Sequence, residues 1–369
     1  MSAAATDSGL SPRAWLAAAL RDGVAPPCGN LHEDQLLRVA GEEGVLALLE
    51  WRLREGHSWP SLPASLRESL SLGARAVAAQ WLLRQRELQR LADAFRQGGF
   101  QVLLLKGSAL GLWLYPQPHL RMGGDIDLLF ASRAEAERAV QALRVLEYEL
   151  VFMPGLTHYE MTCRRVVDGV LRSELDLHCR LVNAPAYAEL LDFDELWDAG
   201  VVLDGLEPAL RGLMPQHALL HACMNRALDM QNAIPDRLKL LYDMRLFCER
   251  FDDKAWQAFV TLAESKGLRG VALRSLLDAR AWLGADVPET VLSGLHAGAG
   301  TEVLDHRRLE DWRYMQVRHW SALPNWRMRV HWLRERLIPS PGQLRELHGQ
   351  GSWWAQVWRR LRLGLARLR

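Results

Sequence analysis

The stretches Gln101-Val-Leu-Leu-Leu-Lys-Gly-Ser108 and Asp125-Ile-Asp-Leu-Leu-Phe130 decide the fold of this 369-residue chain. They predict a buried strand, a short helix that starts at Ser108, and a second strand that opens with two carboxylates. Because residues i and i+2 of a strand point to the same face, Asp125 and Asp127 aim two oxygen ligands at one point. That point lies near a helix N-terminus, where backbone N–H groups favour phosphate. The pattern therefore predicts a divalent cation beside a polyphosphate.

A third acidic position comes much later, in Glu174-Leu-Asp-Leu-His178. Alternation along a strand puts Glu174, Asp176 and His178 on one face, where all three are candidates to line a cleft. Three carboxylates on adjacent strands could hold two metal ions, which clamp the attacking and leaving oxygens of an in-line phosphoryl displacement. Asp176 or Glu174 would be the third ligand, and Asp176 is also a candidate to accept the proton of an attacking hydroxyl.

The residues around the first turn are the predicted triphosphate contacts. Gly107 lets the backbone approach a ligand closely, while Ser108 can cap the helix and offer its hydroxyl. Lys106 is one of four lysines beside 41 arginines, which favours a site with room for an ammonium but not for a planar guanidinium. Arg121 is either a phosphate contact or a structural partner of the two aspartates. An ordinary strand-to-helix turn is the alternative for the Gly-Ser pair, and the absence of a following Gly-Lys-Ser/Thr excludes a P-loop.

The Gly107-Ser108 pair, the Asp125-x-Asp127 pair and the distant Asp176 resemble the nucleotidyltransferase superfamily of DNA polymerase beta. The longer pattern is similar to a bacterial family of uncharacterised nucleotidyltransferases, and the similarity covers most of the chain. Its matching segments are Val45 to Leu49, Lys106 to Ser108, Tyr115-Pro116, Arg121, Asp125 to Leu129, Asp176-Leu-His178, Arg237 to Asp243 and Ile338-Pro-Ser340. The short signature is moderately specific, and the extended pattern is considerably more so.

The resemblance implies an α+β fold, in which a nucleotidyltransferase-type mixed β-sheet core is flanked by N-terminal and C-terminal helical regions. It implies a Mg²⁺-dependent enzyme, with Mn²⁺ as the alternative ion, that moves a nucleoside monophosphate from an NTP such as ATP to an acceptor hydroxyl or phosphate and releases pyrophosphate. Asp125, Asp127 and Asp176 would be its catalytic metal ligands, and Asp176 is favoured over Glu174 because it precedes Leu-His. The acceptor, a small molecule, peptide, protein or nucleic acid, is not identified.

Two patterns in the helical region after residue 200 have two interpretations each. Asp236, Lys239 and Asp243 are spaced i, i+3 and i+7, and they form either a surface ion-pair ladder or, by the resemblance, part of the nucleotide or acceptor cleft. His217 and His221 share a helix face as packed or substrate-facing histidines, or as zinc ligands. The residue after His217 is not Glu, which excludes the metalloprotease helix.

The chain divides into four predicted regions. Residues 1–98 are expected to be helical, 99–200 form the α/β core, 201–300 return to helix, and 301–369 form a basic, Trp- and Arg-rich helical tail. Within them we expect a helix over 42–54, a long helix over 65–97 with Gly73-Ala74 as a candidate break, and a β-hairpin turning at Asp168-Gly169.

The tail concentrates charge in a chain whose net charge is +1. From His306 onward there are 14 Arg, no Lys and 4 acids, a net charge of about +10, together with 7 of the 15 Trp. Arginines stacked on tryptophans at a helical surface explain this composition, and nucleic-acid binding is the alternative. The stretch from 353 to 369 predicts an amphipathic helix, for which membrane attachment is a further interpretation.

Composition also bears on the compartment. No stretch approaches the length of apolar sequence that a membrane span needs, and no secretory signal is evident at the N-terminus. The five cysteines are scattered without a Cys-x-x-Cys motif, which is typical of reduced thiols. We therefore expect a cytoplasmic protein. Besides the enzyme, two other functions remain open from sequence: a non-catalytic nucleotide-binding or scaffold protein on the same fold, and a nucleic-acid-modifying transferase.

Overall fold

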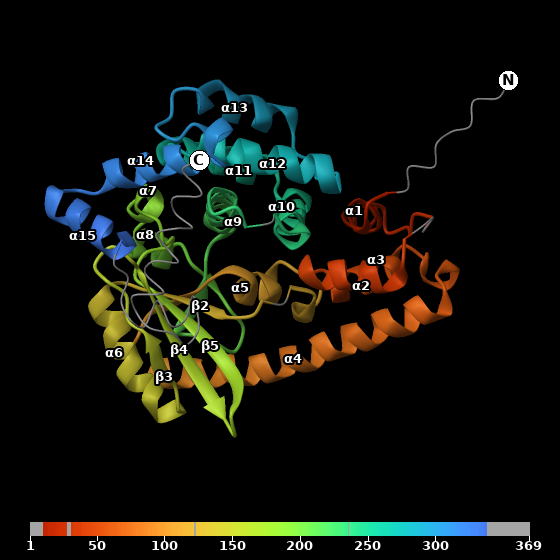
Figure 1. Cartoon of the computed structure of the whole chain (residues 1–369), viewed down its shortest axis with the longest axis horizontal. Helices are drawn as coiled ribbons and strands as arrows, with labels where there is room; N and C mark the ends of the chain where they lie inside the picture. The colour runs from red at the N-terminus through yellow and green to blue at the C-terminus, as the bar shows by residue number, and fades with distance from the viewer. Residues whose placement is uncertain (1–9, 28–30, 122, 235, 338–369) are drawn as a thin grey trace.

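The structure is a computed structural model that describes residues 10–27, 31–121, 123–234 and 236–337 (Figure 1). The predicted Ile338-Pro-Ser340 segment and the amphipathic helix over 353–369 lie outside the described residues. Within that part of the chain, a seven-stranded mixed sheet is flanked by helices that precede and follow it, as the α+β prediction requires. Figure 1 shows α4 along one side of the molecule and the later helices stacked on the opposite side of the sheet.

The N-terminal region consists of four α-helices and a short 3₁₀ helix. These are α1 (Pro12–Asp22), α2 (Glu33–Glu42), α3 (Leu46–Glu55), η1 (Trp59–Ser61) and α4 (Ala64–Gln97). Helix α1 begins at Pro12, because Ser11 Oγ accepts a hydrogen bond from the backbone N–H of Ala14 and proline is favoured in the first turn. The single helix predicted over 42–54 is wrong at its start, because Gly44, at φ +69°, separates α2 from α3.

Helix α4 runs unbroken through Gly73, so the break considered there does not occur. A Cβ at position 73 would lie 2.4 Å from Leu46 Cδ2. Glycine at this position therefore lets α3 pack closely against α4 and does not end the helix.

The sheet has the strand order β3-β4-β5-β2-β1-β7-β6. Strand β2 lies parallel to β5 and antiparallel to β1, while β4 lies antiparallel to both β3 and β5. The strands are β1 (Val102–Leu104), β2 (Ile126–Phe130), β3 (Glu149–Phe152), β4 (Glu160–Val167), β5 (Val170–His178), β6 (Val201–Val202) and β7 (Leu210–Gly212). The β4–β5 hairpin turns at Asp168 and Gly169, at φ +52° and +73°, the backbone that a two-residue hairpin turn with Asp-Gly favours.

The sequence prediction missed two strands, because it expected helix from residue 201 onward. Strand β7 pairs in parallel with β1, and β6 pairs with β7, so the sheet extends past residue 200 to Gly212. These strands are two and three residues long. Such short segments carry no readable alternation. They are strands because β7 pairs with β1 and β6 pairs with β7.

The helices between and after the strands complete the fold. Those within the sheet region are α5 (Lys106–Trp113), η2 (Pro118–Arg121), α6 (Arg133–Leu143), η3 (Arg144–Leu146), α7 (Pro185–Ala188) and α8 (Phe193–Asp198). Those after it are α9 (Pro215–Gln231), α10 (Leu238–Arg250), α11 (Asp253–Ser265), α12 (Arg269–Leu283), α13 (Glu289–Ala299), η4 (His306–Arg308), α14 (Trp312–Ala322) and α15 (Trp326–Leu337). No helix in the described ranges is long and apolar enough to cross a bilayer.

Two hydrophobic cores on opposite faces of the sheet fix which way the carboxylates point. Ile126 and Leu128 of β2 pack with the later half of α4 and with α6, whereas Leu129 packs with the core that contains α9 and α10. Because side chains alternate along a strand, Asp127 shares the face of Leu129. Asp127 therefore faces the C-terminal helices.

The described part of the tail supports the stacking interpretation of its composition. Arg336 lies 4.2 Å from the centre of the Trp332 ring, and Arg327 lies 5.9 Å from that of Trp326. Helix α15 is also held against the loop between β3 and β4, because Glu335 accepts hydrogen bonds from the backbone N–H groups of Leu156 and Thr157.

Candidate metal and nucleotide site

The site is built on the junction between β1 and α5. The backbone N–H of Leu105 donates to the carbonyl of Asp127 at 3.0 Å, which joins the end of β1 to β2. Helix α5 then begins at Lys106, two residues earlier than predicted, so the Gly-Ser pair lies in its first turn. Lys106 has a φ of +50°, a left-handed conformation that costs a non-glycine residue about 1 kcal/mol.

Three carboxylates from two strands meet beside this turn. In the parallel pairing of β2 with β5, Asp127 lies opposite Asp176, and Asp125 immediately precedes β2. One oxygen from each of Asp125, Asp127 and Asp176 lies within 4.8 Å of the others. The structure therefore brings together the three acids that the sequence singled out as metal ligands.

Asp127 is the most enclosed of the three, with an exposed fraction of 3%. Its Oδ1 lies 2.5 Å from Lys106 Nζ and 3.0 Å from His178 Nε2. Burial alone would raise the pKa of Asp127, but the adjacent Lys106 and His178 outweigh burial and hold that pKa well below its usual range. Asp127 is therefore an anion whose orientation two neighbours fix.

Asp176 has a different environment. Thr162 Oγ1 on the neighbouring strand β4 donates to Asp176 Oδ1 at 2.9 Å. Burial, reinforced by the nearby carboxylates of Glu160, Asp127 and Asp125, raises the pKa of Asp176 to about 7. Carboxylates that repel one another in a half-buried site favour a bound proton or a bound cation.

Glu174, the alternative third ligand, does not join this cluster. Its carboxylate pairs with Arg164, the residue opposite it on β4. His178, a candidate cleft residue, is buried with an exposed fraction of 2% and contacts Asp127 directly. The shared strand face was therefore predicted correctly. In the pairing of β2 with β5, the residue opposite Asp127 is Asp176 and not Glu174.

Arg84 is a site residue that the sequence analysis missed. From the middle of α4 its guanidinium donates to Ser108 Oγ at 3.0 Å, to the Asp125 carbonyl at 2.5 Å and to the Gly124 carbonyl at 2.9 Å. It thereby ties the helix that carries the Gly-Ser pair to the loop that carries the first aspartate. Nothing in a long Arg-rich helix distinguishes Arg84, because its partners lie 24 to 41 residues away.

Arg121 has a partner that the sequence did not predict. Its Nε and Nη2 lie 2.6 and 2.7 Å from the two carboxylate oxygens of Asp243, to which Tyr115 also donates at 2.7 Å. Asp243 is buried, with an exposed fraction of 1%, so the interpretation of Asp236, Lys239 and Asp243 as a surface ladder is wrong. The structural partner of Arg121 is this acid of α10 and neither of the two motif aspartates.

The same guanidinium explains why residue 107 is glycine. A Cβ on Gly107 would lie 2.5 Å from Arg121 Nη1, and the bidentate pair with Asp243 holds that atom in place. Glycine is therefore required for packing against Arg121, a reason distinct from the predicted approach to a phosphate.

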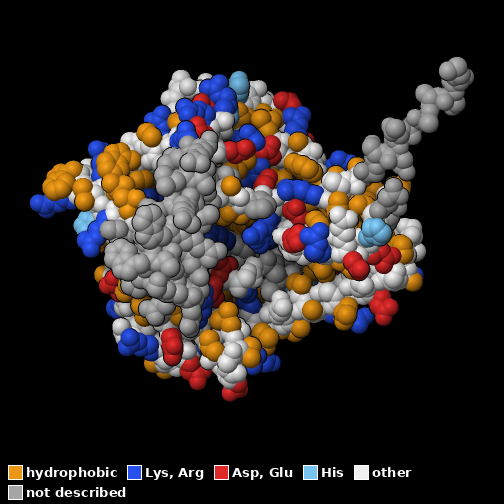
Figure 2. Space-filling model, viewed as in Figure 1, with side chains coloured by type: hydrophobic (Ala, Val, Ile, Leu, Met, Phe, Trp, Pro, Cys, Tyr) orange, Lys and Arg blue, Asp and Glu red, His pale blue; other side chains and the backbone are white. Residues whose placement is uncertain are grey.

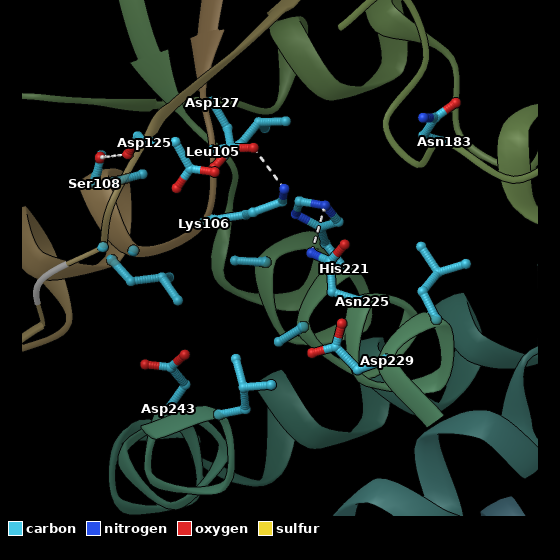
Figure 3. Close-up of a pocket in the computed structure, with 18 of the residues that line it drawn as sticks. Leu105, Lys106, Ser108, Asp125, Asp127, Asn183, His221, Asn225, Asp229 and Asp243 are labelled. Atoms are coloured by element: carbon cyan, nitrogen blue, oxygen red, sulfur yellow. Dashed lines mark hydrogen bonds and ion pairs between the residues drawn. The ribbon is translucent and has the colours of Figure 1, made fainter. Parts of the chain in front are cut away.

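A cavity of about 660 Å³ opens in front of the motif residues. Figure 3 shows Lys106, Ser108 and the two aspartates of the motif on one side of it, across from residues of α9 and α10. The opposite wall is polar, and its labelled residues in Figure 3 are His221, Asn225, Asp229 and Asp243. Arg237, Lys239, Glu160, Asn183, His319 and Arg336 also line the cavity.

Lys239 lies in the far wall of the cavity. This position agrees with the interpretation of Lys239 as a residue of the nucleotide or acceptor cleft. Its aliphatic chain crosses Gly44, where a Cβ would lie 2.6 Å from Lys239 Cδ. Burial, together with Arg121 and Arg237, lowers the pKa of Lys239 to about 8. An ammonium whose charge is disfavoured in this way gains most from an anionic ligand.

The two histidines of α9 contact different side chains. His217 Nε2 lies 3.3 Å from Glu195, whereas His221 Nε2 lies 2.9 Å from the side-chain nitrogen of Asn225. Burial, with smaller contributions from Lys106 and His178, lowers the pKa of His221 to about 3. Among the described residues the cluster able to hold a metal consists of the three aspartates and includes neither histidine.

The donor set of this cluster selects the kind of ion. Three carboxylates supply hard, anionic oxygen ligands, which suit Mg²⁺ and Mn²⁺ rather than softer metals. Asp127 keeps its second oxygen clear of the contacts made by Oδ1. The residues present therefore fit a hard divalent cation.

The comparison with protein families agrees with this geometry. Residues 30–284, or 255 of the 369, match the model of a family described as uncharacterised nucleotidyltransferases. No curated protein matches the chain. The match confirms the family resemblance drawn from the motifs, and it ends before α13, so His319 and Arg336 line the cavity from outside the matched range.

Proposed function

The chain belongs to the family of uncharacterised nucleotidyltransferases, and on that premise we propose that it is a Mg²⁺-dependent enzyme that transfers a nucleoside monophosphate from an NTP to an acceptor. The observation that carries the proposal is the meeting of Asp125, Asp127 and Asp176 within 4.8 Å at the first turn of a helix. Carboxylates so arranged hold divalent cations, and a helix N-terminus favours phosphate. When bound, the cations supply Lewis-acid stabilisation of the charge that develops on the phosphate oxygens.

The triphosphate would lie between the two cationic walls of the cavity. On one wall the first turn of α5 offers backbone N–H groups, the hydroxyl of Ser108 and the Lys106 ammonium. On the other, Arg237 and Lys239 of the α10 region face the same space. Opposed cations that grip both sides of a polyphosphate orient it for in-line attack, which is most of what a phosphoryl-transfer site must do.

Asp176 is our candidate to take the proton from the attacking hydroxyl. Burial raises its pKa to about 7, close to the value at which a general base is most effective near neutral pH. Thr162 holds one of its oxygens at 2.9 Å and thereby fixes its orientation. Bound cations lower the pKa of a carboxylate that ligates them. The role of Asp176 as a general base therefore competes with its role as a metal ligand.

Transfer of label from α-labelled NTPs to pooled acceptors tests the proposal. We expect incorporation that requires Mg²⁺, is lost with EDTA, and falls by about a thousandfold or more in Asp125→Asn/Asp127→Asn and in Asp176→Asn. Asp204→Asn is the control, because that residue is exposed and does not line the cavity. Equal incorporation by the wild type and the Asp125/Asp127 variant would remove the assignment.

One observation favours a second candidate, a nucleotide-binding scaffold without turnover. The Lys106 ammonium lies 2.5 Å from Asp127, so a fixed positive charge already neutralises one of the metal ligands. Calorimetry with Mg²⁺ and a non-hydrolysable NTP, followed by pyrophosphate measurement with the ordinary NTP, separates the candidates. Metal-dependent binding without pyrophosphate release identifies the scaffold.

A further inference from the structure

A second hollow adjoins the reaction site on the outer side of the molecule. It lies between α4 and the β4–β5 hairpin, and its volume is about 660 Å³. The Gly123-Gly124 segment forms one edge, and Gly123 lines both this groove and the cavity in front of the aspartates. The wall between the two spaces is therefore thin at the loop that delivers Asp125.

The groove is strongly basic. It is lined by five arginines and one acid, which are Arg84, Arg86, Arg90, Arg165, Arg172 and Glu87. The carboxylate of Glu87 is already paired within the protein, because it contacts Tyr148, Arg90 and Arg165. The lining residues carry a net charge of +4, although Arg165 also pairs with Glu147 outside the lining. Arg86 and Arg172 are exposed to solvent.

Exposed aliphatic side chains lie among these arginines. Leu83 of α4 and Leu171 of β5 line the groove with exposed fractions of 64% and 53%, and Val166 and Val170 of the hairpin are similarly exposed at 53% and 50%. Figure 2 shows hydrophobic side chains at the lower edge of the molecule, where Figure 1 places α4 and the projecting hairpin. Exposed aliphatic groups among charges are typical of a binding surface for a protein.

The composition distinguishes two classes of polyanion. Surfaces that bind single-stranded nucleic acid combine basic residues with aromatic platforms for the bases, and none of the described residues lining the groove is aromatic. A sugar-phosphate backbone has no aliphatic side chains that would pack against Leu83 and Leu171. An acidic peptide with aliphatic residues covers these leucines and also pairs with the arginines. Charge complementarity together with the apolar lining favours the peptide.

We propose that this groove is the docking surface for an acidic segment of a protein partner that carries aliphatic side chains between its Asp and Glu residues. A segment bound there lies beside the Gly123-Gly124 edge and so next to the three aspartates. That the partner is also the acceptor rests on the proposed transferase function, whereas docking itself does not.

Fluorescence anisotropy of the full-length protein with a short labelled peptide of Glu and Leu tests the docking surface. Two matched peptides, with Gln for Glu and with Ser for Leu, and a single-stranded oligo-uridine serve as comparisons. The protein variant is Arg86→Glu/Arg172→Glu. Its control is Arg75→Glu/Arg144→Glu, which makes the same charge change at exposed arginines outside the groove.

We expect the Glu-Leu peptide to bind more tightly than all three comparison probes, with an affinity that falls as salt rises. The groove variant should weaken this binding about tenfold and the control variant by much less, because the charges it reverses lie at the contact. Tighter binding of the oligo-uridine, equal binding of the Ser-containing peptide, or equal losses in the two variants would each overturn the proposal. Asp125→Asn/Asp127→Asn should bind the peptide like the wild type, so failure of the transferase assignment is read separately.

Discussion

At the scale of single residues, the Gly-Ser and Asp-x-Asp motif depends on an arginine outside it. Arg84 binds Ser108 and the carbonyls of Gly124 and Asp125 at once. Its charge is half enclosed, and burial, which outweighs the nearby Asp125 and Asp127, lowers the pKa of its guanidinium. Three oxygens surround this guanidinium and compensate for its lost hydration. Arg84 therefore fixes the loop that carries Asp125 against the first turn of α5.

We predict that Arg84→Ala weakens Mg²⁺ activation of transfer about 10- to 100-fold, the range typical of residues that orient metal ligands. The Mg²⁺ dependence of the transfer rate measures the effect, and circular dichroism checks the fold. Arg75→Ala, an exposed position on the same helix, is the control. A variant with an unchanged Mg²⁺ dependence would show that Asp125 is positioned without Arg84.

Lys239 gives the site a pH dependence. Its pKa is lowered to about 8 by burial and by Arg121 and Arg237, so the ammonium is charged below pH 8 and progressively neutral above it. We predict that kcat/KM for the NTP falls as pH rises through 8, because the far wall then loses a cation for the triphosphate. In Lys239→Arg this fall should disappear, since a guanidinium stays charged.

A comparison of Lys239→Arg with Lys254→Arg, an exposed position on α11, isolates the effect. The profile of kcat/KM reports groups of the free enzyme, which is the state described by the structure. An identical alkaline fall in all three proteins would assign the titration to another group.

At the scale of elements, the pair of Arg121 with Asp243 joins η2 to α10 in the interior. The exposed fractions of the two side chains are 5% and 1%. Removal of one partner from a buried pair leaves an uncompensated charge and costs about 3–5 kcal/mol. We therefore predict that Asp243→Asn lowers the free energy of unfolding by about that amount in urea titrations.

Asp253→Asn, at an exposed position in the first turn of the next helix, should change the free energy of unfolding by less than about 1 kcal/mol. If Asp243→Asn were as stable as this control, the contact between η2 and α10 would not contribute to stability as described.

Elements with a local signature could be predicted from the sequence, and elements that depend on distant partners could not. The Asp168-Gly169 turn and the two acidic strands follow from backbone preference and alternation. The start of α5 at Lys106, the continuity of α4 through Gly73 and the strands β6 and β7 all depend on residues far along the chain, such as Leu46 for Gly73. Propensity contains no information about these partners. The sequence therefore placed the start of α5 two residues late and missed β6 and β7, while it left the continuity of α4 through Gly73 open.

The same division applies to the site. Asp125 and Asp127 were identifiable from their i, i+2 spacing, and Asp176 was chosen over Glu174 by the family resemblance. Arg84 and the Arg121–Asp243 pair were not, because neither contact has a sequence period. Both are side-chain contacts between segments that the fold alone brings together.

At the scale of the whole molecule, the cavity joins the sheet to the helices of the C-terminal half. Its lining comes from α5, α9, α10, α14 and α15 and from the loop before β2. A ligand that fills it therefore contacts segments that are far apart in the sequence. Binding to the folded state alone stabilises a protein by about 2.7 kcal/mol at a ligand concentration 100 times Kd.

We accordingly predict that Mg²⁺ and a non-hydrolysable NTP together raise the melting temperature, while either alone has a much smaller effect. Differential scanning fluorimetry measures the shift, with Asp125→Asn/Asp127→Asn as the comparison. An equal shift in that variant would mean that the nucleotide binds away from the three aspartates.

The pairing of Asp127 with Asp176 across β2 and β5 has a consequence for the timing of biosynthesis. Asp176 follows Asp127 by 49 positions, and the two carboxylates become neighbours when a parallel strand pair closes. Closure of such a long loop is slow in comparison with local structure. A nascent chain on the ribosome thus lacks the complete set of three carboxylates until β5 has emerged and paired with β2.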